Sequence, residues 1–381
     1  MSREALHKRF TPEAVSFLKA ILSQLVTSHL DFGNKSIPSG FFNKVCIKDS
    51  TKFRMPDRFF SDYPGFKVYH RQVSMMNIQY EYDILSGNWT YLELTKATRN
   101  DQLDSRETLD NIQSGDLYIR DLGYTTFKYL ESIEDKNAFF LNRLPTIGIS
   151  IVTPNGFEKI NWGKLHKRMQ KSKANEMELE VFVGNQEKIK ARMVLFPVDK
   201  KVSEKRIRRA AGYADRKNGY QLSKDYKIKS QYSIFITNVP KEVLSIAQIQ
   251  STYRLRWQIE IIFKAWKSHL SIHKVKYIKK ERLECQLLAR FIWIILNWKI
   301  FQVANFIARK IHPTVACSVI KFYKRALRFS VTLRSLAKVK NGIIKWLSSV
   351  IWTLTKSIII EEKKHKLSHP KILNELYIYL S

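Results

Sequence analysis

Residues 253–267 read Tyr-Arg-Leu-Arg-Trp-Gln-Ile-Glu-Ile-Ile-Phe-Lys-Ala-Trp-Lys. Within this run, Tyr253, Arg256, Glu260 and Lys267 are separated by steps of three, four and seven residues. An α-helix turns by roughly 100° per residue, so these steps place the four side chains within about 60° of arc on one face. A phenol, a guanidinium, a carboxylate and an ammonium group on one face suit a helix that offers a metal-binding carboxylate and holds a phosphate chain beside it.

The same helix carries an apolar stripe that is predicted to pack into a core. The stripe consists of Leu255, Ile259, Ile262, Phe263 and Trp266. Arg256 and Glu260 also form an i,i+4 pair, which on an exposed helix contributes only about 0.2–0.5 kcal/mol. The polar face is therefore either a solvated charged surface or a functional one, and acids elsewhere in the chain favour the second interpretation.

The composition indicates a large globular protein with a polyanionic partner. The chain has 381 residues, 44% of them hydrophobic, which is enough for about two or three structural units with cores of their own. Lys and Arg number 66 against 34 Asp and Glu, so the formal net charge is +32. A charge of this size, spread along the chain, favours association with nucleic acid. Eight Trp and seventeen Tyr are interleaved with the basic residues, and such rings can stack on unpaired bases.

Cysteine usage and hydropathy argue against several other classes. Cys46, Cys285 and Cys317 are far apart and odd in number, so they indicate a reducing compartment rather than a disulfide framework or a zinc knuckle. The first ten residues lack the apolar core of a signal peptide. The apolar segments 291–296 and 343–360 are interrupted before about 18 residues, so we expect buried amphipathic helices rather than membrane spans.

The pattern of apolar runs up to residue 144 predicts a mixed α/β layout. Thr11 is the expected N-cap of a first helix, with Pro12 at its first position. The expected elements are a helix over 11–30, strands over 44–48, 77–85 and 89–95, a helix over 106–113, a strand over 117–121, a helix over 126–133 and a strand over 138–144.

The sequence pattern changes after Pro145. Residues 145–240 combine short β-like runs with connections rich in Lys and Arg. The connection 200–217 holds Arg206 and Arg208 and is either a nucleic-acid contact or a solvated linker. The expected regions are 1–40, a helical segment; 41–144 and 241–300, the two parts of an α/β core; 145–240, a β-rich basic insertion; and 301–381, a helical C-terminal region.

Two aspartates at strand ends join Glu260 as candidate metal ligands. Asp49 follows the strand 44–48, and Asp121 follows an apolar strand and precedes a glycine turn. Side chains at the carboxyl ends of strands project into the crevice where α/β proteins bind ligands. Two Asp and one Glu suit Mg²⁺ or Mn²⁺, and two such ions about 3.5–4 Å apart can activate the attacking oxygen and stabilise the leaving oxygen of a phosphodiester.

Competing sites have weaker support. His269 and His273 are four residues apart but lack the Glu of the zinc-protease pattern, and no phosphate-binding loop or dinucleotide fingerprint is present. Four rival acids occupy positions that also suit caps and turns, namely Asp83, Asp101, Asp104 and Asp116.

In combination these residues resemble the DDE transposases of bacterial insertion sequences, specifically the IS-four type with a Tyr-(2)-Arg-(3)-Glu-(6)-Lys signature. The signature stands complete as Tyr253, Arg256, Glu260 and Lys267. The resemblance runs from about residue 2 to residue 290 and includes Ile-Lys-Asp-Ser-Thr at 47–51, Tyr-Pro-Gly at 63–65, Asp-Ile-Leu-Ser-Gly at 83–87, Asp-Leu-Gly-Tyr at 121–124 and Thr-Asn-Val-Pro at 237–240.

The resemblance implies an α/β fold, with a ribonuclease-H-like mixed sheet, a β-rich insertion and flanking helices. Asp49, Asp121 and Glu260 would be the catalytic, metal-binding triad, with Mg²⁺ or Mn²⁺ as the cofactor. The signature residues Tyr253, Arg256 and Lys267 would contact DNA phosphates near the cut end. Further DNA contacts are predicted from Lys264, Arg206 and Arg208, and base stacking from Trp162.

Transposases of this type nick the transposon end, let the new 3′ hydroxyl attack the opposite strand to form a hairpin, reopen it, and join the end to target DNA. The implied partners are the double-stranded DNA of the transposon ends and of the target, with a homodimer in the synaptic complex and no membrane. The implied location is the bacterial cytoplasm, in association with the nucleoid.

Residues 2–10 resemble a segment that lies well inside longer relatives, after a helical DNA-binding region. The sequence therefore predicts that this region is missing here. Two alternatives follow, a truncated and inactive DNA-binding remnant, or a ribonuclease-H-like nuclease in repair. The signature helix argues against the nuclease.

Overall fold

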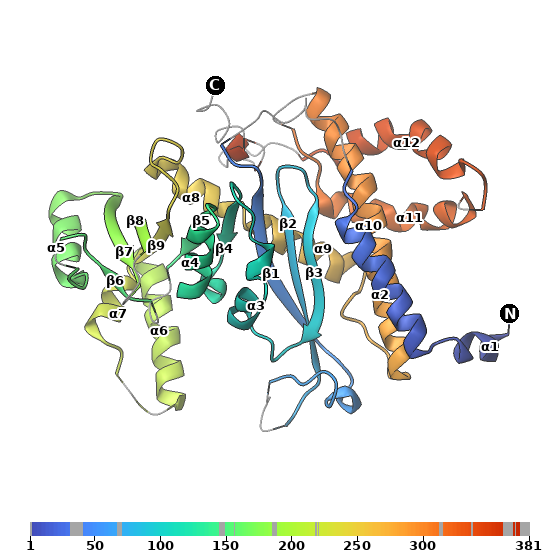
Figure 1. The fold of residues 1–381 in the computed structure, drawn as a ribbon, viewed down its shortest axis with the longest axis horizontal. Coiled ribbons are helices and arrows are strands. Elements are labelled where there is room, and N and C mark those ends of the chain that lie inside the picture. The colour runs from blue at the N-terminus through green and yellow to red at the C-terminus, as the bar shows by residue number, and fades with distance from the viewer. Residues whose placement is uncertain are drawn as a thin grey trace.

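The computed structural model describes residues 2–30, 41–66, 71–144, 149–155, 157–184, 189–217, 219, 221–311, 315–336, 338–360, 369 and 371–373. Within these residues, nine strands form one sheet in the order β3-β2-β1-β4-β5-β9-β8-β7-β6, with helices packed around it (Figure 1). The strands are β1 (Val45–Arg54), β2 (Met75–Asp83), β3 (Trp89–Lys96), β4 (Leu117–Arg120), β5 (Phe139–Arg143), β6 (Ile151–Val152), β7 (Met177–Val183), β8 (Ile189–Pro197) and β9 (Tyr232–Thr237).

The helices lie at both ends of the sheet and along its faces. They are α1 (Arg3–Lys8), α2 (Pro12–Thr27), α3 (Asp101–Glu107), α4 (Phe127–Asp135), α5 (Trp162–Ser172), α6 (Lys200–Lys217), α7 (Lys224–Lys229), α8 (Ile246–Arg254), α9 (Trp257–His269), α10 (Lys280–Ile311), α11 (Val319–Leu336) and α12 (Gly342–Ile358), with 3-10 turns η1 (Asp57–Phe59), η2 (Leu109–Asn111) and η3 (Leu122–Tyr124). The first long helix begins as expected, because the Thr11 hydroxyl accepts a hydrogen bond from the Ala14 N–H and Pro12 opens α2.

Five strands form the half of the sheet that carries the candidate site. β1, β2 and β3 are consecutive antiparallel neighbours, whereas β4 and β5 run parallel to β1. Parallel neighbours need a crossover connection, and α3 and α4 lie in the two connections that lead to β4 and β5. The order 3-2-1-4-5 with these directions is that of a ribonuclease-H-like sheet, so the predicted fold class is confirmed.

The other strands extend the same sheet. β9 pairs antiparallel with both β5 and β8, so the chain returns to the first five strands through β9. Residues 200–217 form helix α6, and the prediction of a connection was wrong because Lys, Arg, Glu and Ala are all favourable in helices. The division into five regions stays a prediction, and residues 31–40 and 145–148 lie outside the described part.

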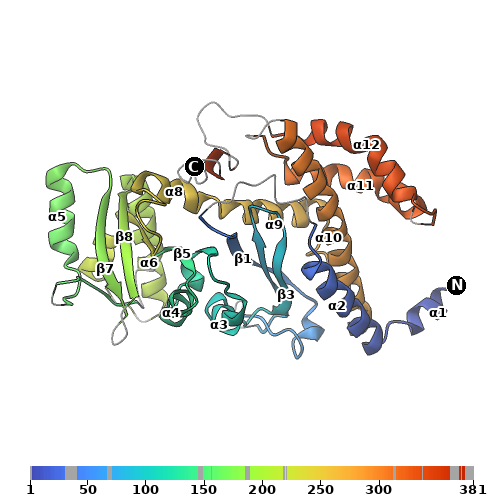
Figure 2. The same ribbon diagram turned by 45° about the horizontal axis from the view of Figure 1, so that its top comes forward.

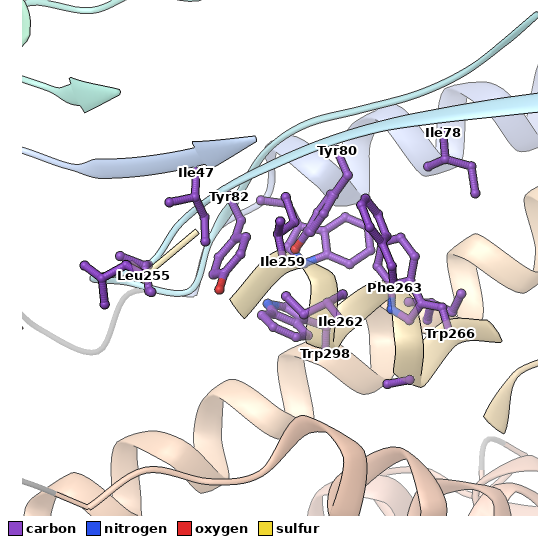
Figure 3. Close-up of a cluster of buried hydrophobic side chains, with 14 of the residues drawn as sticks. Ile47, Ile78, Tyr80, Tyr82, Leu255, Ile259, Ile262, Phe263, Trp266 and Trp298 are labelled. Carbon is purple, nitrogen blue, oxygen red and sulfur yellow. The ribbon is translucent and has the colours of Figure 1, made fainter. Parts of the chain in front are cut away.

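Part of the main core lies between β1–β2 and the helix α9 (Figure 3). Ile259 and Trp266 are fully buried there, as the apolar stripe predicted. The Trp266 ring lies 5.0 Å, centroid to centroid, from that of Tyr80 on β2. This packing fixes α9 against the sheet and thereby sets the position of its polar face.

α10 is long and apolar enough to cross a membrane by length and composition, and it is the one such helix among the described residues. Its side chains Phe291, Ile294 and Trp298 are nevertheless buried in the main core, and the Trp298 indole donates a hydrogen bond to the Gly87 carbonyl at 2.7 Å. The helix also lies along α2 and α12 (Figure 1). One face of α10 is therefore packed in the core, as expected for an amphipathic helix over residues 291–296, whereas Leu296 is exposed.

Two predicted boundaries near the candidate site were wrong. The helix expected over 106–113 is α3, which begins at Asp101 because the Asn100 side chain caps it by accepting from the Leu103 N–H at 2.9 Å. The strand expected to end at Lys48 continues to Arg54, because its pairing with β2 extends to that residue.

Candidate active site

Strand register brings the two candidate aspartates to one place. β1 and β4 are parallel and pair Ile47 with Ile119, and the same register continued by two residues sets Asp49 level with Asp121. Asp49 was expected to follow its strand, but it lies inside β1, and it is β4 that ends, at Arg120. Both aspartates therefore lie at the carboxyl end of β4, the kind of position where α/β proteins bind ligands.

Glu260 joins this edge through Arg256. One guanidinium nitrogen of Arg256 lies 2.8 Å from Asp49 Oδ2, and another lies 2.6 Å from Glu260 Oε1. The Arg256 side chain is only 9% exposed, against 21% for Asp49 and 36% for Glu260. The pair 256–260 is thus part of a three-residue bridge with charge-assisted hydrogen bonds, rather than an isolated surface ion pair.

Tyr253 holds Asp121, the remaining candidate acid. Its hydroxyl donates to Asp121 Oδ1 at 2.9 Å, and its ring lies 4.9 Å from that of Phe235 on β9. Because β9 pairs with β5, the phenol is braced by the sheet itself. The three carboxylates therefore meet around one phenol and one guanidinium that come from consecutive helices.

Tyr253 and Arg256 flank a break between two helices. α8 and α9 run in succession from the β7–β9 half of the molecule toward α10 (Figure 2). The prediction that one continuous helix carries the signature was therefore wrong. Across the break the Arg256 N–H bonds to the Tyr253 carbonyl, an i→i+3 bond. Residues three apart in such a tightened turn lie in line, so both side chains still face the same edge.

The three acids share one electrostatic site. The pKa of Asp49 is raised to about 6, chiefly by burial, with smaller contributions from the charges of Asp121 and Glu260. The Arg256 guanidinium and the Ser50 N–H act in the opposite direction and lower it. Burial also raises the pKa of Tyr253, with a further contribution from Asp121. The phenol therefore keeps its proton and donates a hydrogen bond to Asp121.

Residues 40–296 match the protein family described as "Transposase DDE domain". This stretch is more than half of the chain and contains Asp49, Asp121 and Glu260. The chain belongs to the DDE transposase family.

Named relatives of this DDE transposase come from insertion sequences. The IS231B transposase of Bacillus thuringiensis subsp. berliner is 32% identical over 328 residues, or 81% of this chain and 68% of that protein. The IS231D transposase of B. thuringiensis subsp. finitimus is 33% identical and covers 78% and 65%, and the IS1151 transposase of Clostridium perfringens is 25% identical and covers 96% and 80%. Among solved structures, a piggyBac transposase synaptic complex with hairpin DNA aligns with a TM-score of 0.46 at 10% identity, over 97% of this chain and 66% of that one. The predicted resemblance is confirmed.

The three candidate carboxylates form a donor set whose chemistry suits a divalent cation. Carboxylate oxygens are the ligands that Mg²⁺ and Mn²⁺ prefer. A cation would offset both the burial, which is the main cause of the raised pKa of Asp49, and the smaller repulsion from Asp121 and Glu260. Across the described ranges, no three His, Cys, Asp or Glu side chains lie close enough together to hold one ion. In this conformation the Arg256 guanidinium occupies the space between Asp49 and Glu260 and supplies the positive charge.

The last signature residue of the transposase lies beside the site. The Lys267 ammonium is 3.4 Å from the Lys52 carbonyl of β1, and partial burial lowers its pKa. Lys264, one turn earlier on α9, is exposed. Both lysines therefore lie along α9 beyond Glu260, and their contacts with DNA stay a prediction.

The remaining predicted DNA contacts lie near β9 and on α5 and α6. Arg206 donates to the carbonyls of Ser230 and Tyr232 at 3.1 and 2.8 Å, so it anchors α6 against β9, whereas Arg208 is exposed. Trp162 opens α5 and is only 6% exposed, with the Lys229 ammonium over its ring at 4.7 Å. A base would need an open ring face, so stacking by Trp162 is an untested prediction that this conformation does not favour.

Sequence reasoning missed the polar layer behind the triad. Asn77, Gln79 and Glu81 alternate with apolar residues along β2, a pattern typical of a solvated face, yet all three are buried. Gln79 donates to Asp101, which was treated as an ordinary turn residue. The N-cap Asn100 could have marked the start of α3, but no local pattern places Asp101 over this face.

Proposed function

We propose that this transposase cuts DNA strands in a metal-dependent reaction and joins the cut end to target DNA, moving an insertion sequence by cut and paste. The observation that carries the proposal is the meeting of Asp49, Asp121 and Glu260 around Tyr253 and Arg256. The three acids come from three separate elements and lie around these two side chains, inside a protein of strongly positive net charge.

Asp49, Asp121 and Glu260 would hold Mg²⁺ or Mn²⁺. A bound pair of such ions activates the attacking oxygen and stabilises the leaving oxygen of a phosphodiester. Arg256 offers phosphate oxygens a forked set of N–H donors, and Lys267 offers a point charge. In the proposed complex these two side chains hold the strand while the carboxylates orient the reacting phosphate.

Double-stranded DNA of the element ends and of the target is the proposed partner. Two helices beside β6–β9 present exposed basic residues that suit a phosphate backbone. These residues are Lys164, Lys167, Arg168 and Lys171 on α5, and Lys200, Lys201, Lys205, Arg208 and Arg209 on α6. Two copies of the chain would pair the two ends, in a complex associated with the bacterial nucleoid.

Cleavage is tested with a labelled element end. The wild-type chain should nick it in Mg²⁺ and leave a 3′ hydroxyl, whereas Asp49→Ala and Glu260→Ala should lose at least about 100-fold in rate, as expected when transition-state charge stabilisation is removed. Asp135→Ala removes an exposed carboxylate at the end of α4 and serves as the control. Equal rates in all four proteins would rule out the triad. Salt-sensitive DNA binding without nicking in any divalent metal would instead identify a silent remnant.

The hairpin step is tested on the same substrate. After the nick, the new 3′ hydroxyl is proposed to attack the opposite strand, which joins the two strands covalently and releases the flanking DNA. A denaturing gel would then show a product of doubled strand length that disappears on reopening. Double-strand breaks without this species would contradict the hairpin but leave the metal-dependent cleavage intact.

A further inference from the structure

Asp101 lies on the opposite face of the sheet from the bridge made by Arg256. β1 and β2 pair Ser50 with Gln79, so these two side chains share one face, while Asp49 points to the other. Asp101 Oδ1 accepts from the Ser50 hydroxyl at 2.8 Å and from the Gln79 amide at 3.2 Å. One carboxylate oxygen therefore ties two strands of the sheet to the first turn of α3.

The contact with Ser50 reaches Asp49 directly. The Ser50 N–H donates to Asp49 Oδ1 at 2.8 Å, while Asp49 Oδ2 is held by Arg256. Ser50 is thus fixed by Asp101 through its side chain and fixes Asp49 through its backbone. The direction of the Asp49 carboxylate depends on both oxygens being held.

A second branch reaches the turn that carries Asp121. A Cβ added to Gly123 would lie only 2.9 Å from Asp101 Oδ2, so Asp101 packs directly against this turn. The Tyr124 hydroxyl donates to Gln79 Oε1 at 2.7 Å, and the Tyr124 N–H donates to the Asp121 carbonyl at 3.1 Å. Asp101 and Gln79 therefore brace the residues that follow Asp121.

The contacts from Asp101 toward Asp49 and toward Asp121 are buried and are anchored by further hydrogen bonds. Gln79 and Tyr124 are 0% and 1% exposed. The start of α3 is fixed to β2, because the Asn77 amide donates to the Arg99 carbonyl at 3.1 Å. The Ser105 hydroxyl of α3 also donates to the Tyr124 carbonyl at 2.9 Å. A displacement of Asp101 would thus be transmitted to the triad rather than absorbed by solvent.

We propose that Asp101 is a positioning residue that fixes the direction of the Asp49 carboxylate and the turn that carries Asp121. The inference rests on the proposed function, because it treats these aspartates as metal ligands. Partners that orient metal ligands are worth about 10–100-fold in metal affinity or activity when removed. The Asp101 carboxylate is hydrogen-bonded to Ser50 and Gln79, so it would act on the metal ligands through these two residues.

The test measures Mn²⁺ binding to the full chain without DNA, by electron paramagnetic resonance, together with the melting temperature. Asp101→Ala should weaken Mn²⁺ binding by about 10-fold or more. Asp101→Asn keeps the acceptor oxygen for Ser50 and Gln79, so it should recover most of the affinity. Asp110→Ala removes an exposed carboxylate from the neighbouring η2 turn and should bind Mn²⁺ like the wild type.

Wild-type affinity in Asp101→Ala, or equal losses in the Ala and Asn variants, would overturn the proposal. If Asp101→Ala does not fold, Ser50→Ala tests the same link from the other side and should also weaken binding. Failure of the proposed function looks different, because Mn²⁺ would then bind equally to the wild type and to Asp49→Ala, or to neither.

Discussion

Burial of Asp49 makes its charged form less stable. Its pKa of about 6 exceeds the ordinary value of 3.8, chiefly because of burial. Between these two values the folded state binds more protons than the unfolded state, so this group makes the fold less stable as the pH rises from about 4 to about 6. A carboxylate kept in such a setting fits a site that is built to receive a cation.

Replacement of Asp49 by Asn should therefore stabilise the metal-free protein at pH 7. A shift of two units corresponds to roughly 3 kcal/mol at most, and the neutral amide avoids that cost. We expect the melting temperature of the variant to increase relative to that of the wild type from pH 4 through pH 5 and 6 to pH 7. A difference in melting temperature that is constant over this range, or that decreases toward pH 7, would contradict the assignment of the raised pKa to Asp49.

In the proposed metal-bound state, Arg256 would compete with the ion for the same carboxylate oxygens. Its guanidinium lies 2.8 Å from Asp49 and 2.6 Å from Glu260, so a cation bound by both acids must displace it. Arg256→Gln should raise the affinity of the DNA-free protein for Mn²⁺ several-fold, while it weakens binding to an element end. A Mn²⁺ titration and a gel-shift assay measure the two effects. A fall in Mn²⁺ affinity would show that Arg256 supports the metal site rather than competing for it.

At the scale of elements, α9 combines a buried face with a functional one. Trp266 is fully buried against Tyr80, whereas Trp257 on the same helix is 57% exposed. Trp266→Ala should cost about 3–5 kcal/mol in the free energy of unfolding, because it leaves a cavity in the main core. Trp257→Ala should change it by no more than about 0.5 kcal/mol, as is usual for exposed positions. Urea unfolding measures both, and equal losses would contradict the packing of α9.

The period of the apolar residues predicted the buried face of α9 correctly, because Ile259 and Trp266 follow the helical repeat. The break before Trp257 was not predicted, since Leu255 and Arg256 keep helical backbone angles and no Pro or Gly marks the position. The start of α3 was missed because a cap at Asn100 depends on one side-chain hydrogen bond in a polar stretch. Local patterns thus predicted the long elements but not their junctions.

The candidate site was predicted only in part. The signature and the strand ends identified Asp49, Asp121 and Glu260 as candidates, but their meeting depends on the pairing of β1 with β4 and on the docking of α9. The role inferred for Asp101 had no sequence signal of its own, because its partners Ser50 and Gln79 come from other strands. Contacts between distant segments depend on how the sheet packs. A pattern along the sequence does not reveal these contacts.

At the scale of the whole molecule, the formal charge of +32 predicts DNA binding that falls steeply with salt. Removing three exposed charges from α6, in the triple variant Lys205→Ala, Arg208→Ala and Arg209→Ala, should lower the salt slope by up to about 0.9 for each phosphate that the variant no longer neutralises. The matched control removes the exposed Lys338, Lys340 and Lys345 near the start of α12. Gel shifts at several salt concentrations give the slopes, and equal slopes in both variants would contradict a footprint on α6.

The central claim is that Asp49, Asp121 and Glu260 bind the metal that drives cleavage. The most direct measurement is metal rescue of Asp121→Cys in the nicking assay, because a thiolate binds the hard ion Mg²⁺ poorly and softer ions better. We predict that this variant is inactive in Mg²⁺ and regains nicking in Mn²⁺, while Asp121→Ala stays inactive in both. Full activity of Asp121→Cys in Mg²⁺, or rescue of Asp121→Ala by Mn²⁺ to the same extent, would contradict the claim.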